Sequence, residues 1–198
     1  AVGKTSFIRS IGICVIMAQA GLYVPCSSFE YIPYESIFTR ILGNDNIFKG
    51  LSTFGVEMSE LRVILNMANE NSLILGDELC SGTEYDSALS IFVSGLNELH
   101  KKESSFIFAT HLHEIVDYDE IKRLTKLNMK HMVVRYDREK DMLIYDRILR
   151  DGCGESMYGL EVCESLHMPD DFLQNAKMIR KKYLKKEGAL SLKSSHFN

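Results

Sequence analysis

The sequence lacks three features that would place it outside the cell or in a membrane. None of its five cysteines forms a Cys-x-x-Cys pair, and an odd number of scattered cysteines indicates free thiols in a reducing compartment and argues against zinc. No apolar run reaches bilayer length, because Gly12 and Gln19 interrupt the apolar residues 10–20, so this segment is expected to be a buried helix. No secretory signal is visible. We therefore expect an intracellular protein, in the cytoplasm, the nucleus or an organelle, with no membrane partner.

The sequence also lacks an excess of positive charge. Its formal net charge is -4, so the chain as a whole has no field that attracts nucleic acid, and any contact with DNA must be local or made elsewhere. With 198 residues, of which 45% are hydrophobic, the chain can bury one sizeable core, and this composition excludes a disordered or fibrous protein. Length and composition fit one α/β domain.

The first residues match the end of a phosphate-binding loop. Such a loop consists of a strand, the sequence Gly-x-x-x-x-Gly-Lys-[Ser/Thr] and a helix, whose backbone N–H groups surround the phosphates. Gly3, Lys4 and Thr5 supply the last three positions, so the first glycine and the strand would lie before Ala1. We expect the chain to begin inside its own phosphate loop, with nucleotide bound by Gly3, Lys4, Thr5 and Ser6. Alternatively the match arises by chance, and Lys4 is an exposed lysine on a first helical turn.

Two adjacent carboxylates follow an apolar segment later in the chain. Asp77 and Glu78 come directly after residues 72–76, which we expect to form a buried strand. Two acids at the end of a buried strand are costly unless a cation compensates for their desolvation, and Mg²⁺ can do so. Asp77 would hold Mg²⁺ through its water shell, Thr5 would ligate it directly, and Lys4 would contact the β- and γ-phosphates. Glu78 would polarise the attacking water, unless the acidic pair merely caps or precedes the next helix.

Two further motifs have both a structural and a functional interpretation. Ser52 and Thr53 precede a predicted helix over 56–70, so their hydroxyl groups could cap it, or could face the phosphates of a second subunit's nucleotide. The second interpretation makes the active site a dimer interface. His111 follows a predicted buried strand over 105–109, and is either a core residue or a group that reaches the γ-phosphate or its water. We favour the functional role of His111 because α/β sites assemble at that edge of a sheet.

The remaining pattern of the first half predicts alternating helices and strands. Besides the segments already named, we expect a helix over 4–20, extended segments near 29–32 and 36–42, and a helix that the capping-box spacing Thr83-x-x-Asp86 opens. The buried stripe of that last helix is expected to comprise Ala88, Leu89, Phe92, Leu96 and Leu99. In the helix over 56–70, the polar residues lie mostly on the side opposite the apolar residues, and Glu57 is expected among them. Helices between strands imply crossover connections and hence a mainly parallel sheet.

The pattern changes beyond residue 120. Two extended runs over 127–136 and 142–149, joined by a charged turn, indicate a hairpin. Helices are expected near 156–166 and from Pro169, where proline suits the first helical position. The second helix carries a basic cluster, which we interpret as a solvated face rather than a DNA contact. This cluster comprises Lys177, Arg180, Lys181, Lys182, Lys185 and Lys186. From Gly188 onward the composition indicates a linker or a frayed end.

Taken together, these motifs resemble those of one protein family. The chain contains, in this order, Gly3-Lys4-Thr5, Phe38-Thr39-Arg40, Leu51-Ser52-Thr53-Phe54 with Glu57-Met58, Asp77-Glu78 with Gly82-Thr83, and Phe108-Ala109-Thr110-His111. In order and spacing they resemble the ATPase domain of the MutS mismatch-repair family. The C-terminal part, with Tyr158-Gly159-Leu160 and Pro169 before a long helix, resembles that family's dimerising segment. The resemblance covers nearly the whole chain.

The resemblance implies a fold and a set of roles. The fold would be an α/β, ABC-type P-loop ATPase with a mainly parallel sheet flanked by helices and a C-terminal hairpin and helical dimerisation segment. The cofactors would be ATP and Mg²⁺, with catalysis by Glu78 and by His111 as the switch residue. Nucleotide would be bound by Gly3, Lys4, Thr5 and Ser6, and across the dimer by Ser52 and Thr53, while Thr5 and Asp77 would hold the metal. The ATPase core would span residues 1–150, the dimerisation segment 151–187, and a linker or disordered tail 188–198.

The resemblance also implies partners. Family members pair with a second copy or a paralogue, and couple ATP binding and hydrolysis to a clamp on mismatched DNA and to recruitment of downstream repair factors. The domains that contact the mismatch would lie upstream of Ala1, so this chain is not expected to recognise a mismatch by itself.

The chain departs from the family pattern beside the acids. Many relatives have Asp-Glu-Ile-Gly-Arg-Gly-Thr, where this chain has Leu79, Cys80 and Ser81, which indicates a divergent branch and leaves an anti-recombination branch as an alternative. A Rad50- or cohesin-like ATPase head is another alternative, but its Leu-Ser-Gly-Gly-Gln signature is not matched by Thr53-Phe54-Gly55. In a third alternative, of a different class, the chain is a dimerisation module that binds no nucleotide because its phosphate loop is incomplete.

Overall fold

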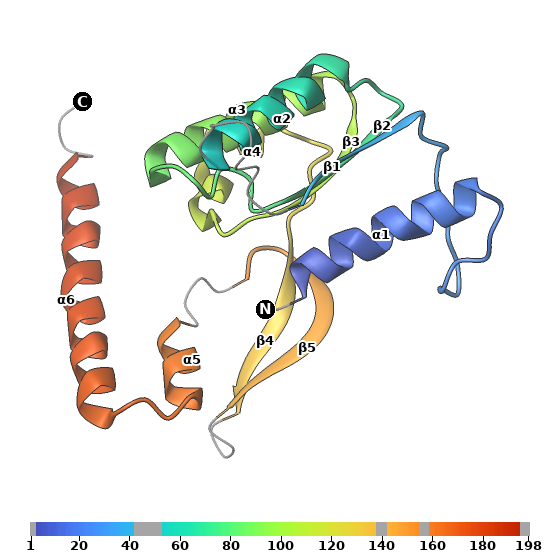
Figure 1. The fold of residues 1–198 in the computed structure, drawn as a ribbon. Helices are drawn as coiled ribbons and strands as arrows, with labels where there is room; N and C mark the ends of the chain where they lie inside the picture. Colours follow the sequence, from blue (N-terminus) through green and yellow to red (C-terminus); the bar gives the residue numbers. More distant parts are fainter. Residues whose placement is uncertain (1–2, 42–52, 138–141, 155–158, 195–198) are drawn as a thin grey trace. The chain divides into compact units, whose positions relative to one another are not determined.

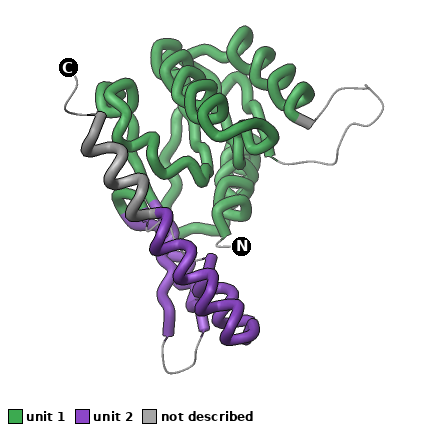
Figure 2. The backbone as a smooth tube through the Cα atoms, turned by 90° about the vertical axis from the view of Figure 1, so that its left-hand side faces the viewer, with its two compact units in different colours: residues 1–130, 151–153 green, residues 131–150, 154–198 purple. Residues whose placement is uncertain are grey.

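The structure is a computed structural model that describes residues 3–41, 53–137, 142–154 and 159–194. It divides into two compact units (Figure 2). Unit 1 comprises Ala1–Lys130 with Asp151–Cys153, and unit 2 comprises His131–Arg150 with Gly154–Asn198. Within the described ranges, no helix is long and apolar enough to cross a membrane.

Unit 1 is built on a parallel three-stranded sheet in the order β1-β2-β3 (Figure 1). In chain order its elements are α1 (Lys4–Gln19), β1 (Ser36–Arg40), α2 (Thr53–Met67), β2 (Ser72–Asp77), α3 (Tyr85–Lys101), β3 (Ser105–Ala109), the short 3-10 helix η2 (His113–Asp117) and α4 (Asp119–Lys122). A helix therefore lies between successive strands, as parallel pairing requires. The register joins Arg40 to Gly76 and Asp77 to Ala109, so the carboxyl ends of all three strands meet at one edge.

Alternate residues of the central strand β2 pack against helices on opposite faces of the sheet. Leu73 and Leu75 share a cluster with Ile8 of α1, whereas Ile74 shares one with Leu99 of α3 and with residues of α2. Because side chains on a strand alternate with a period of two, both faces of β2 are covered and all of its residues are buried. The strand that carries the two acids is thus the most enclosed element of the sheet.

Unit 2 contains a two-stranded sheet and two helices. The strands are β4 (Lys130–Asp137) and β5 (Met142–Asp151), and the helices are α5 (Gly159–Ser165) and α6 (Asp170–Ser194). The first residue of β4, Lys130, and the last residue of β5, Asp151, belong to unit 1. An ion pair joins Lys177 to Glu164, and Arg180 lies 3.5 Å from Glu161, so charged contacts hold α5 and α6 together. Lys177 and Arg180 belong to the predicted basic cluster, and part of that cluster therefore serves this helix pair.

The structure confirms most of the predicted elements. The helix over 4–20, the strands over 72–76 and 105–109, the parallel sheet and the pairing of two strands after residue 127 are all present. The predicted stripe of α3 is buried throughout. The charged turn of the hairpin after Asp137 and the start of the helix predicted near 156 lie outside the described residues.

Two predictions about extended and helical segments were wrong. Residues 29–32 form no strand, because Pro33 follows with no amide hydrogen to donate and Ile32 is 78% exposed. The segment pairs with no described strand, although Phe29 packs against the cluster that contains Ile8. The predicted capping box at Thr83 is also absent, since α3 begins after Glu84 and the Thr83 hydroxyl donates 3.1 Å to the carboxylate of Glu84.

Several element boundaries differ from the prediction. The runs predicted over 127–136 and 142–149 are β4 (Lys130–Asp137) and β5 (Met142–Asp151). The strand predicted over 36–42 ends at Arg40, with residue 42 outside the described residues. The helix predicted over 56–70 is α2, which ends at Met67 because the Asn69 side chain accepts hydrogen bonds from the residues that follow it and ends the helix locally. The helix α6 continues to Ser194, through most of the segment predicted as a tail.

Candidate functional site

The site is built at the carboxyl edge of the sheet in unit 1, where β2 and β3 end and α1 begins. Ligands of open α/β sheets bind at this edge, because loops there leave room beyond the strand ends. Asp77 ends β2 and Glu78 follows it, His111 follows β3, and Lys4 and Thr5 form the first turn of α1. The fold thus gathers side chains from three separate parts of the sequence, as the sequence predicted.

The first turn of α1 is suited to an anion. Gly3 precedes the helix with φ +97, a left-handed conformation that residues with a side chain rarely adopt. As a glycine it offers no side chain to cap the first N–H groups, and its carbonyl accepts the Phe7 amide at 3.0 Å. Uncapped N–H groups and the positive end of the helix dipole favour a negatively charged ligand at this position.

Lys4 adds a positive charge beside that turn. Its ammonium group donates to the Thr110 carbonyl at 3.4 Å and lies 3.3 Å from Nδ1 of His111. Burial lowers the pKa of Lys4, while the carboxylates of Glu78 and Asp77 oppose that shift. The lysine is therefore partly desolvated and held by neighbouring groups, which strengthens its interaction with an anion in the site.

Thr5 and Asp77 form an oxygen-rich pair next to Lys4. The Thr5 hydroxyl donates to Oδ2 of Asp77 at 2.5 Å, and Asp77 is only 3% exposed. Its other oxygen, Oδ1, is buried and has no hydrogen-bond partner among the described residues. A buried carboxylate oxygen without a partner is costly, and a hard cation such as Mg²⁺ would remove that cost. The residues present fit a magnesium ion.

The protein does not supply a complete cage for such an ion. Within the described residues, no three His, Cys, Asp or Glu side chains lie close enough together to hold a metal. Mg²⁺ retains several waters and commonly takes one or two protein ligands together with phosphate oxygens. A cation held by Thr5 and Asp77 would accordingly need a phosphate-bearing ligand to complete its coordination.

Glu78 and His111 form a contact at the mouth of the site. Oε1 of Glu78 lies 2.8 Å from Nε2 of His111, and their side chains are 35% and 64% exposed. The arrangement fits an imidazole that donates Nε2–H to Glu78 and accepts from Lys4 at Nδ1. Burial lowers the pKa of the neighbouring His113, and the positive charge of Lys4 lowers it further. A carboxylate paired with an imidazole in this exposed position can receive and orient a water proton.

The other residues predicted to bind nucleotide are Ser6, Ser52 and Thr53. Ser6 is exposed on α1 and makes no hydrogen bond with the acids among the described residues. Ser52 lies outside the described residues, and Thr53 is the first residue of α2 with its side chain outside the described part. Their assignment to nucleotide remains a prediction.

Sequence reasoning missed a buried charged pair beneath the site. Glu57 was assigned to the polar side of its helix, but it is 2% exposed and accepts the Cys80 amide at 2.9 Å. Nη2 of Arg40, whose side chain is 8% exposed, lies 3.6 Å from the same carboxylate oxygen. Burial raises the pKa of Glu57, against the effects of the Cys80 amide and Arg40. Both residues belong to motifs that carry the family resemblance, Phe38-Thr39-Arg40 and Glu57-Met58, but those motifs do not indicate that the two side chains pair.

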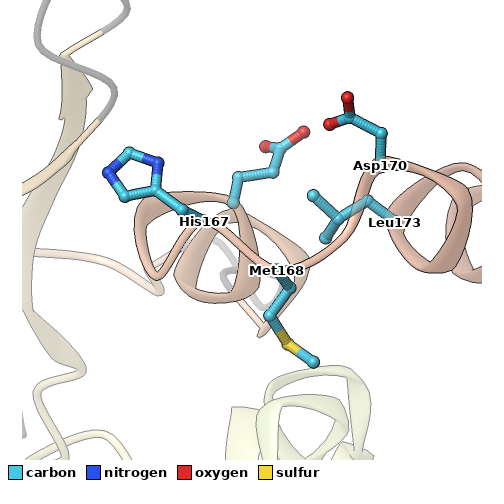
Figure 3. A pocket seen from close by; sticks show the side chains of 5 residues that line it. His167, Met168, Asp170 and Leu173 are labelled. Carbon is cyan, nitrogen blue, oxygen red and sulfur yellow. The ribbon is translucent and has the colours of Figure 1, made fainter.

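Unit 2 contributes none of the predicted catalytic residues. Figure 3 shows a hollow there, lined by Glu164, His167, Met168, Asp170 and Leu173. Its two carboxylates give it an acidic lining, which is unsuited to a phosphate. The candidate nucleotide site is thus confined to unit 1 among the residues that the structure describes.

Comparison with known proteins places the chain in one family. Residues 1–184 match the family described as MutS domain V. The chain is 45% identical over 183 residues to a mutS homologue of Acanthamoeba polyphaga mimivirus, covering 91% of this chain and 16% of that protein. It is 41% identical over 179 residues to the mitochondrial DNA mismatch repair protein mutS homologue of Sarcophyton glaucum, covering 90% of this chain and 18% of that protein. It is 35% identical over 192 residues to the DNA mismatch repair protein MutS of Acholeplasma laidlawii, covering 94% and 22%. The chain therefore spans 16% to 22% of the length of these relatives.

Proposed function

Because the chain belongs to the MutS family of DNA mismatch repair proteins, we propose that it is the ATP-binding and ATP-hydrolysing part of a protein that acts on mismatched DNA. The observation that supports this most is the convergence of Lys4, Thr5, Asp77, Glu78 and His111 at one edge of the sheet. The finer assignment to an ABC-type P-loop fold belongs to the same proposal, and the parallel sheet with crossover helices supports it.

Phosphate binding is assigned to the first turn of α1. The N–H groups that follow Gly3 would donate to phosphate oxygens, and the ammonium group of Lys4 would face the β- and γ-phosphates. Thr5 and Asp77 would hold Mg²⁺, since Asp77 has a buried oxygen without a partner among the described residues. When bound, Mg²⁺ supplies positive charge that offsets the charge of the phosphate oxygens.

Hydrolysis is assigned to Glu78 and His111. The Glu78 carboxylate would accept the proton of the attacking water as the oxygen approaches the γ-phosphorus. His111, at 2.8 Å from that carboxylate, would hold it in place and contact the γ-phosphate or its water. Lys4 lies within 3.3 Å of the imidazole, so phosphate binding and the position of His111 are physically linked.

The proposal includes a dimer, either of two copies or with a paralogue. Thr53 begins α2, and the N-terminus of a helix attracts anions, so Ser52 and Thr53 are assigned to the nucleotide of the opposite subunit. Residues 151–187 are assigned to dimerisation. Contacts with mismatched DNA and with downstream repair factors are assigned to other parts of the longer protein. The assignment to mismatched DNA is in keeping with the relatives, which are named DNA mismatch repair proteins.

The test is the loss of hydrolysis without the loss of binding. In the full-length protein that contains this chain, Glu78→Ala removes the proposed proton acceptor and leaves Lys4, Thr5 and Asp77 in place. We expect ATP hydrolysis to fall by about 10²- to 10⁴-fold, the usual contribution of a positioned general base, with ATP affinity retained. Glu120→Ala is the matched control, because Glu120 is an exposed glutamate of α4. Turnover by Glu78→Ala equal to that of the control would contradict the assignment.

A further inference from the structure

The turn that follows β2 has a strained backbone. Glu78 has φ 51 and Cys80 has φ 69, both in the left-handed region that residues with a Cβ rarely adopt. Such a conformation persists only where surrounding contacts hold it. Because Glu78 is itself part of the turn, whatever holds the turn also determines where the Glu78 carboxylate points.

Among the described residues, three hydrogen bonds from or to the backbone hold this turn. The Glu78 amide donates to the Ala109 carbonyl at 2.9 Å, and the Ser81 amide donates to the Glu78 carbonyl at 3.3 Å. These two bonds use backbone groups of β3 and of the turn itself. The third is different, because the Cys80 amide donates to the side chain of Glu57, 2.9 Å away on α2. A side-chain carboxylate on a separate helix therefore fixes the second left-handed residue.

The Glu57 carboxylate is well placed to act as an anchor. It is 2% exposed, so water does not compete for the Cys80 amide, and a hydrogen bond to a charged group in such surroundings is strong. Arg40 approaches the same oxygen at 3.6 Å and also lies 3.0 Å from Oε2 of Glu60. Glu60 is half exposed and contacts Arg40 without touching the turn, which makes it a natural control.

We propose that Glu57 is a positioning residue for ATP hydrolysis: by accepting the Cys80 amide, its carboxylate holds the left-handed Glu78–Cys80 turn that presents Glu78 to His111. In this role Glu57 acts through the backbone of the turn, by way of the Cys80 amide, and not on the nucleotide directly. It lies on α2, the helix that begins at Thr53, so a displacement of α2 reaches Glu78 through this bond. This inference rests on the proposed function of the Glu78–His111 pair.

The test measures kcat and KM for ATP in the full-length protein that contains this chain. Glu57→Ala removes the acceptor, and we expect kcat to fall about 10- to 100-fold, as for loss of a charged hydrogen bond, with KM nearly unchanged. Glu57→Gln retains an acceptor oxygen and is expected to restore most of the rate. Glu60→Gln weakens the contact with Arg40 but leaves the Cys80 bond intact, and is expected to behave like the wild type.

A second pair of variants separates positioning from simple stability. Cys80→Gly allows the left-handed backbone without an anchor, so the double variant Glu57→Ala with Cys80→Gly is expected to recover part of the lost kcat. If Glu57→Ala does not fold, Glu57→Asp decides, since it keeps a charge beside Arg40 but withdraws the oxygen from the Cys80 amide and should also lower kcat.

The outcomes separate this inference from the proposed function. A wild-type protein that hydrolyses no ATP overturns the proposed function and this inference with it. A wild-type protein that is active, with Glu57→Ala or Glu57→Asp as active as Glu60→Gln, overturns the positioning role alone. The positioning role is also contradicted if the double variant Glu57→Ala with Cys80→Gly has no higher kcat than Glu57→Ala alone.

Discussion

Replacing Gly76 with alanine is expected to disrupt the strand that carries the two acids. A Cβ at position 76 would lie 2.2 Å from both Cδ1 and Cε1 of Phe108 on the neighbouring strand. Carbon atoms in contact normally stay about 3.5–4.0 Å apart, so the ring or the strand must move. The ring has little freedom, because Phe108 packs edge-on against Phe92 with centroids 5.7 Å apart, and Phe92 is fully buried.

The expected cost follows from this lack of space. Overpacking a core position typically costs about 1–3 kcal/mol, which in a protein of this size lowers Tm by roughly 3–10 °C. Gly95→Ala is the matched control. Among the described residues, no heavy atom would lie within 4 Å of a Cβ at position 95 of α3, and alanine is favoured over glycine by about 1 kcal/mol inside a helix. We therefore expect Gly95→Ala to leave stability unchanged or to raise it slightly.

Two assays check this prediction in the full-length protein. Calorimetry gives the Tm of the transition that contains this domain, and hydrogen exchange measured by mass spectrometry reports protection of peptides from β2. The double variant Gly76→Ala with Phe108→Leu removes ring atoms from the contact and should recover part of the lost stability. Gly76→Ala as stable as Gly95→Ala, or no recovery on adding Phe108→Leu, would refute the predicted clash with Phe108.

Two further predictions follow from pKa shifts. Burial raises the pKa of Cys80 to about 12, so this thiol is expected to react slowly at pH 8. Iodoacetamide should therefore label the exposed Cys26 and Cys153 much faster than Cys80. Equal labelling rates, measured by mass spectrometry, would contradict this. Burial raises the pKa of Glu57 above its ordinary value of 4.5, so folding favours the protonated form and the contribution of this group to stability is lost as pH rises through the raised pKa. The Tm of the wild type relative to Glu57→Gln should consequently increase as pH is lowered from neutral toward 4.5, whereas a constant difference would show that Glu57 does not titrate there.

The alternation of helices and strands could be predicted because apolar periodicity reports burial directly. β2 was predictable as a strand since its apolar run is short and ends in acids, and the parallel sheet followed from the helices between strands. The extended segment predicted near 29–32 was wrong for a reason that lies in tertiary structure. Alternation describes a strand only where another strand can pair with it, and Pro33 leaves this segment outside the sheet.

The site could be predicted as far as its motifs are local. The chemical groups of the site belong to short sequence motifs, which are Gly3-Lys4-Thr5, Asp77-Glu78 and the segment that ends at His111. The fold brings these motifs together. The Glu57 anchor could not be predicted, because its partner is a backbone amide, which leaves no trace in residue type. Helical periodicity placed Glu57 on the polar face, and only the three-dimensional packing of Arg40 and Cys80 explains why a carboxylate is buried there.

The central claim is that this chain is the ATP-hydrolysing part of a mismatch repair protein. The most direct test measures steady-state ATP hydrolysis by the full-length protein with no DNA, with a fully paired duplex and with the same duplex carrying one mismatch. The account predicts turnover that depends on Glu78 and changes with the mismatch. Turnover that is the same with all three, or that persists in Glu78→Ala, would contradict it.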